Sequence, residues 1–121
     1  MFDKIIKHCP CCSAPFTAKE ILDSNAVIPI GMMVDFDDPK LAFYYFNHNT
    51  NTCKSTFTIP VAEFDAYINP DKNLKIQTNK NGCGGYCLEV EDESTCYNNC
   101  RWAQYRLFIA KLMENKRVFT V

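Results

Sequence analysis

Neither sign of charge is in surplus in this chain. Its 13 Lys and Arg residues nearly match its 14 Asp and Glu residues, so the formal net charge is −1. Attraction to the phosphates of nucleic acid ordinarily needs a basic surplus or patch. The composition therefore makes nucleic acid an unlikely partner class, and a nucleic-acid adaptor is only a third alternative, supported by the local basic group Lys111, Lys116 and Arg117.

Long apolar runs are also missing. No segment approaches the roughly 20 apolar residues that cross a bilayer. Met1 to Lys7 places Asp3, Lys4 and Lys7 around a short pair of isoleucines, which is unlike a signal peptide. We therefore expect no membrane association and a cytoplasmic location, where thiols are kept reduced. The chain also lacks a phosphate-binding glycine loop, a dinucleotide fingerprint and a serine nucleophile elbow.

Cysteine, in contrast, is abundant. Eight cysteines occur among 121 residues, and this density indicates either disulfides in an oxidising compartment or metal and redox chemistry in a reducing one. They form three groups along the chain: Cys9, Cys11 and Cys12; Cys53, close to His48; and Cys83, Cys87, Cys96 and Cys100. Because we expect a cytoplasmic protein, metal binding is the better interpretation.

The first two groups predict one zinc site. Cys9 and Cys12 form a CxxC pair, whose tight turn can direct two sulfurs at one ion. His48 and Cys53, separated by four residues between two predicted strands, supply the second ligand pair. Cys11 either replaces Cys9 or Cys12 as a ligand or remains a reactive free thiol beside the site.

With this pattern, the segment from Cys9 to Ile59 resembles a zinc ribbon (zinc knuckle) protein. The resemblance implies two knuckles that hold a structural ion, with a β-hairpin between them. It covers less than half of the chain. The segment departs from the commonest ribbon in the longer spacing of its second pair and in a helix inserted after the first knuckle.

The last cysteine group contains twin CxxxC pairs, Cys83 with Cys87 and Cys96 with Cys100. Residues four apart on a helix share a face, so Cys96 and Cys100 can point to one site. We expect a second zinc ion here, which makes two in all. The alternatives are an iron–sulfur cluster at the same residues and two disulfides, because twin CxxxC motifs resemble the disulfide-clamped hairpins of small intermembrane-space chaperones.

Apolar periodicity and turn residues predict an α+β fold. A capping box at Thr17 and Glu20 starts a short helix that runs to about Asp23. The other predicted elements are a hairpin over 27–36 and 41–47, a third strand over 54–59, a helix from Pro60 that ends at Asn69-Pro70, and a long helix from Ser94 to about Lys116. We expect Trp102, on the long amphipathic helix, to be a core residue.

These elements predict a zinc-ribbon-like domain over residues 1–70, a linker over 71–82, and a metal-binding segment with a C-terminal helix over 83–121. Four protein ligands leave a zinc ion no open position, so we do not expect an enzyme. The preferred function is an intracellular protein-interaction module with structural zinc, whose partner contacts Arg101, Tyr105 and Phe108 on the long helix. The main alternative is a thiol-redox or metal-handling protein that uses the second cysteine cluster.

Overall fold

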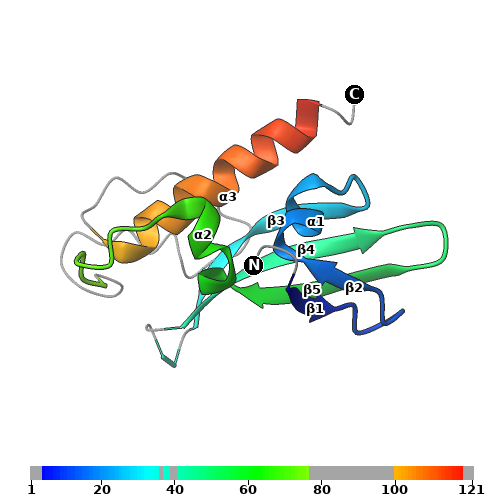
Figure 1. Cartoon of the computed structure of the whole chain (residues 1–121), viewed down its shortest axis with the longest axis horizontal. Coiled ribbons are helices and arrows are strands. Elements are labelled where there is room, and N and C mark those ends of the chain that lie inside the picture. The colour runs from blue at the N-terminus through cyan, green and yellow to red at the C-terminus, as the bar shows by residue number, and fades with distance from the viewer. Residues whose placement is uncertain (1–3, 36, 39–40, 77–99, 119–121) are drawn as a thin grey trace.

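The computed structural model describes residues 4–35, 37–38, 41–76 and 100–118, and its class is α+β, as predicted (Figure 1). Its elements in chain order are β1 (Ile5–His8), β2 (Pro15–Thr17), α1 (Ala18–Asp23), β3 (Val27–Val34), β4 (Ala42–Asn49), β5 (Lys54–Pro60), the 3-10 helix η1 (Val61–Phe64), α2 (Asp65–Ile68) and α3 (Arg101–Val118). Strands β1 and β2 form one small antiparallel sheet, and β3, β4 and β5 form a second sheet in that order.

Strand β4 is the centre of the larger sheet. It pairs antiparallel with β3, where Val27 lies opposite His48, and with β5, where Ser55 lies opposite the same His48. Buried and less buried side chains alternate along β4, as the period of a strand requires. His48 therefore points to the same buried face of the sheet as Tyr44 and Phe46.

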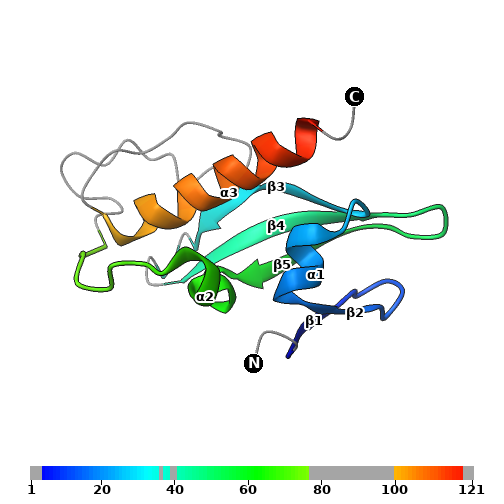
Figure 2. The same cartoon turned by 45° about the horizontal axis from the view of Figure 1, so that its top comes forward.

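Helix α3 covers this buried face, and both views show it crossing the sheet (Figures 1 and 2). The ring of Tyr44 stacks on that of Phe108, with centroids 6.2 Å apart. The hydroxyl of Tyr44 donates to the backbone carbonyl of Tyr105 over 2.6 Å. The hydroxyl of Tyr105 in turn donates to Asp65 over 2.8 Å. One chain of contacts thus joins β4, α3 and α2.

The far end of α3 is attached to α1 through Lys116. Its ammonium group donates to the carbonyl oxygens of Ile21, Ser24 and Val27 over 2.9, 2.9 and 2.6 Å. The last carbonyls of a helix have no partner within the helix, and a cation is favourable at that end. Lys116 therefore caps α1 and fixes the start of β3 in one contact.

Most of the predicted elements are confirmed. Thr17 and Glu20 form the expected capping box, and Asn69, with a φ of 51°, ends α2 before Pro70. Trp102 is buried, as expected. Strands β1 and β2 were not predicted, because each is too short for its alternation to stand out.

The predicted partner surface on the long helix is wrong. Tyr105 is 3% exposed, and Phe108 packs on Tyr44. The guanidinium group of Arg101 donates to the carbonyls of Leu74 and Lys72. Helical periodicity places these three side chains on the sheet side of α3 or against the segment before it, so they are internal contacts.

Two further predictions fall wholly or partly on residues 77–99, outside the described residues: the start of the long helix at Ser94, and the linker with its domain boundaries. Both stay predictions. Among the described residues, every helix is too short or too polar to cross a membrane.

Candidate metal centre

The first ligand pair lies in the turn between β1 and β2. The N–H of Cys9 donates to the carbonyl of Ala14, and the N–H of Ser13 donates to the carbonyl of Cys9, each over 2.9 Å. Ser13 takes a left-handed conformation, with a φ of 64°, which tightens the turn. The chain therefore doubles back within six residues, from Cys9 to Ala14, and presents the thiols of Cys9 and Cys12 from one turn.

The second pair lies at the connection from β4 to β5. His48 is inside β4 rather than in the loop where it was predicted, and it is buried. Cys53 directly precedes β5 and is also buried. The Thr50 hydroxyl accepts a hydrogen bond of 2.9 Å from the N–H of Cys53, which closes the connection. This turn carries Cys53 back beside His48.

The four predicted ligands meet at one point. The ligand atoms of Cys9, Cys12, His48 and Cys53 all lie within 4.8 Å of one another. The Sγ atoms of Cys9 and Cys53 are 3.7 Å apart, and Sγ of Cys12 is 3.6 Å from Nδ1 of His48. A tetrahedral zinc ion, with ordinary bond lengths, separates two sulfurs by about 3.8 Å and a sulfur from a nitrogen by about 3.6 Å. Both distances fit a tetrahedral ion.

Ser55 supports two of the thiols. Its hydroxyl lies 3.2 Å from Sγ of Cys9 and 3.4 Å from Sγ of Cys53. Burial raises the pKa of the Cys9 thiol, but hydrogen bonds from Ser55 and from the backbone N–H groups of Cys12 and Cys11 outweigh burial and lower that pKa to about 5. The cluster thus contains a thiolate that is stabilised by donors, the form in which cysteine binds metal.

For Cys53 the balance is reversed. The hydrogen bond with Ser55 lowers the pKa of its thiol, but desolvation and the adjacent thiol of Cys9 outweigh it, so the pKa is raised above its ordinary value. Thiols this close cannot all ionise without a cation between them. A metal ion would supply that cation.

Aromatic side chains enclose the imidazole. The ring of Phe16 meets that of His48 edge to face, with centroids 5.2 Å apart, and lies 5.8 Å from the ring of Phe57. Such an apolar surround holds the ring in place and limits the access of water to a metal site. Phe16, in β2, also joins the small sheet to the larger one.

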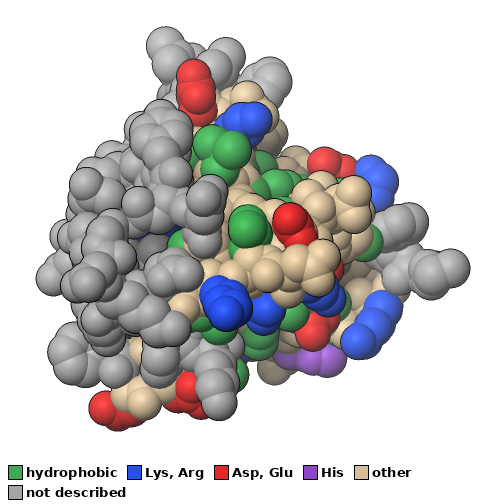
Figure 3. Space-filling model, turned by 90° about the vertical axis from the view of Figure 1, so that its left-hand side faces the viewer, with side chains coloured by type: hydrophobic (Ala, Val, Ile, Leu, Met, Phe, Trp, Pro, Cys, Tyr) green, Lys and Arg blue, Asp and Glu red, His purple; other side chains and the backbone are tan. Residues whose placement is uncertain are grey.

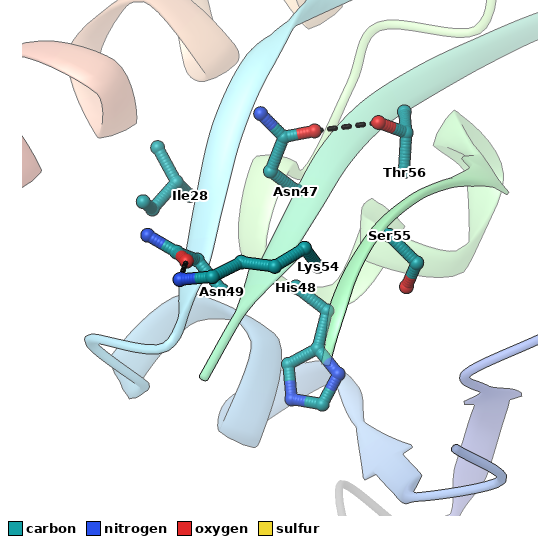
Figure 4. A pocket seen from close by; sticks show the side chains of 7 residues that line it. All are labelled: Ile28, Asn47, His48, Asn49, Lys54, Ser55 and Thr56. Carbon is teal, nitrogen blue, oxygen red and sulfur yellow. Dashed lines mark hydrogen bonds between the residues drawn. The ribbon is translucent and has the colours of Figure 1, made fainter. Parts of the chain in front are cut away.

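The opposite side of β4 and β5 carries a shallow groove of about 330 Å³ (Figure 4). Asn47 and Thr56 line it and are joined by a hydrogen bond of 2.6 Å. The ring of His48 and the hydroxyl of Ser55 point away from this pair (Figure 4). The groove therefore lies on the other side of the strands from the ligand atoms.

Searches against protein-family models, curated proteins and solved structures found no match. The zinc-ribbon resemblance therefore stays a prediction. The site has to be interpreted from its own chemistry.

The remaining site predictions have different outcomes. Cys11 is exposed and is not one of the four clustered ligands. Cys83, Cys87 and Cys96 lie outside the described residues, whereas Cys100 is buried directly before α3. A second zinc ion, an iron–sulfur cluster and disulfides in that group all stay predictions.

Sequence reasoning missed Ser55. A usable signal was present, because Ser55 follows Cys53 by two positions in a strand and so shares its face. A hydroxyl placed there can reach whatever the cysteine thiol binds.

Proposed function

We propose that Cys9, Cys12, His48 and Cys53 bind one zinc ion and that this ion is structural. The observation that carries the proposal is the pair of distances that match tetrahedral edges, 3.7 Å between Cys9 and Cys53 and 3.6 Å between Cys12 and His48. Three thiolates with one imidazole form a common ligand set of structural zinc. Four protein ligands would leave the ion no open position for a substrate.

The ion would join two parts of the fold that share few other described contacts. Cys9 and Cys12 belong to the β1–β2 turn, whereas His48 and Cys53 belong to the larger sheet. The other printed contacts between the two sheets are the packing of Phe16 on His48 and Phe57 and the ammonium group of Lys7, 5.9 Å from the ring centroid of Phe57. A two-stranded sheet is marginally stable alone. Zinc would therefore supply much of the free energy that holds β1–β2 in place.

We further propose that the protein is a binding module for another protein. Leu107 is 42% exposed, and Lys111 and Glu114 are exposed beside it on the same face of α3. Acidic and basic side chains both occur on the face shown in Figure 3, and neither covers it. An apolar side chain among charges of both signs suits a protein partner better than a polyanion.

The test of the structural ion is thermal unfolding of the metal-free protein with and without added zinc, compared between the wild type and Cys53→Ser. We expect zinc to raise Tm in the wild type by several degrees more than in Cys53→Ser, because the ion binds only the folded state. Comparison with the variant removes any contribution of zinc bound elsewhere in the chain. An equal rise of Tm in both proteins would refute the proposal.

The binding role has a separate test. A photoreactive amino acid in place of Leu107 should cross-link to a partner protein, and the same probe at Phe108 should cross-link only within the chain. Cross-linking to nucleic acid, or within the chain alone at both positions, would overturn the proposed interaction surface.

A further inference from the structure

A fifth thiol lies beside the proposed ligands. Cys11 sits between Cys9 and Cys12 in the β1–β2 turn, and its backbone N–H donates to the thiol of Cys9. It is not one of the four residues whose ligand atoms lie within 4.8 Å of one another. The turn therefore fixes a spare thiol at the edge of a complete ligand set.

The spare thiol faces solvent, whereas most of the ligands do not. Cys11 and Cys12 are exposed, and Cys9 and Cys53 are buried with 2% exposed surface each. A soluble oxidant can therefore reach Cys11 before it reaches the buried thiols.

Cys11 also contacts one buried ligand. Its thiol forms a hydrogen bond with that of Cys53. These two residues are 42 positions apart and lie in different hairpins, so a bond between them is not confined to the strained ring that two consecutive cysteines must form. Of the thiols around the site, Cys11 thus combines access to solvent with direct contact to a buried ligand.

We propose that Cys11 is an oxidation site through which hydrogen peroxide removes Cys53 from the metal centre as a Cys11–Cys53 disulfide. This inference rests on the proposed zinc site. The remaining set, Cys9, Cys12 and His48, provides three ligands rather than four, and the ion is released. The thiol reserved by the sequence beside the CxxC pair then makes the metal centre sensitive to oxidation.

The chemistry balances in two steps. The thiolate of Cys11 attacks one oxygen of hydrogen peroxide, the O–O bond breaks, and Cys11 sulfenic acid and hydroxide form. The thiolate of Cys53 leaves the zinc ion and attacks the sulfur of that sulfenic acid, which releases a second hydroxide. Two thiolates are oxidised by two electrons in total, and one peroxide is reduced to two hydroxides, which water at neutral pH protonates.

Peptide mapping identifies the bond. Trypsin cuts after Lys7, Lys19, Lys40 and Lys54, so Cys11 lies in the peptide 8–19 and Cys53 is the one cysteine of the peptide 41–54. Zinc-loaded full-length protein would be treated with hydrogen peroxide, alkylated and digested, and released zinc would be followed with a colorimetric chelator. We expect the peptides 8–19 and 41–54 to be joined through Cys11, with loss of one zinc ion per chain.

Two variants complete the test. Cys11→Ser should hold as much zinc as the wild type before oxidation, form no cross-link to the peptide 41–54, and keep under peroxide the ion that the wild type loses. Ser13→Ala, an exposed change in the same turn, should behave as the wild type. Equal zinc loss from the wild type and Cys11→Ser, or a cross-link through Cys9 or Cys12, would overturn the inference.

The untreated samples separate this inference from the zinc proposal. If wild type and Cys53→Ser hold the same amount of zinc before oxidation, the proposed function fails and the release step fails with it. If the wild type holds one ion more and peroxide does not release it, the proposed function stands and the inference alone is wrong.

Discussion

The Sγ atoms of Cys9 and Cys53 lie 3.7 Å apart, although 44 positions separate these residues in the chain. The hydroxyl of Ser55 reaches both sulfurs. Two buried thiols at this distance, with Cys12 and His48 completing the group, form a preorganised ligand set rather than a chance contact in a core. The site makes separate predictions for its ligands and for the groups that support them.

Ser55 should tune the affinity for zinc without being a ligand. Ser55→Ala removes the hydroxyl that contacts the sulfurs of Cys9 and Cys53, and loss of such an outer-shell partner typically weakens metal binding by about 10- to 100-fold. Competition with a chromophoric chelator measures this change. Thr56→Ala is the matched control, because its side chain contacts Asn47 on the other side of the strand. Equal affinity of the two variants would show that Ser55 plays no such part.

Lys116 should be a stabilising residue at the far end of the molecule. Lys116→Met leaves the carbonyls of Ile21, Ser24 and Val27 without their ammonium donor, and we expect the free energy of unfolding to fall by about 2 kcal/mol. Lys111→Met, an exposed change on the same helix, should cost less than about 0.5 kcal/mol. Urea denaturation of both variants tests this difference. Similar losses in the two would contradict the capping role.

Tyr44 should contribute through its hydroxyl as well as its ring. Tyr44→Phe keeps the stacking on Phe108 but removes the hydrogen bond of 2.6 Å to the carbonyl of Tyr105. We expect a loss of about 1 kcal/mol in the free energy of unfolding. Tyr45→Phe, at the next position on the less buried face of β4, should change it by less than about 0.5 kcal/mol. The account fails here if urea denaturation gives the two variants equal stability.

The ligand set could be predicted because it depends on residue type and spacing. A CxxC pair needs one tight turn, and His48 and Cys53 needed only to be near a strand connection for the second pair to form. The capping box at Thr17 and the strand alternation of β4 were likewise local signals. Each of these features could be inferred without knowing what packs against what.

Features that depend on distant parts of the chain could not be predicted in this way. The periodicity of the long helix shows that Tyr105 and Phe108 are on apolar positions, but not that Tyr44 and Asp65 cover them. The same holds for Lys116, whose carbonyl partners lie about ninety positions earlier in the chain. Strands β1 and β2 become recognisable only once the turn around Cys9 to Ser13 has paired them.

The most direct test of the central claim is the amount of zinc bound per chain, measured by elemental mass spectrometry on the wild type and on Cys9→Ser/Cys53→Ser. Zinc held by the remaining cysteines contributes equally to both proteins, so the difference reports this site alone. We predict that the double variant binds one zinc ion fewer per chain than the wild type. The same zinc content in both proteins would contradict the account.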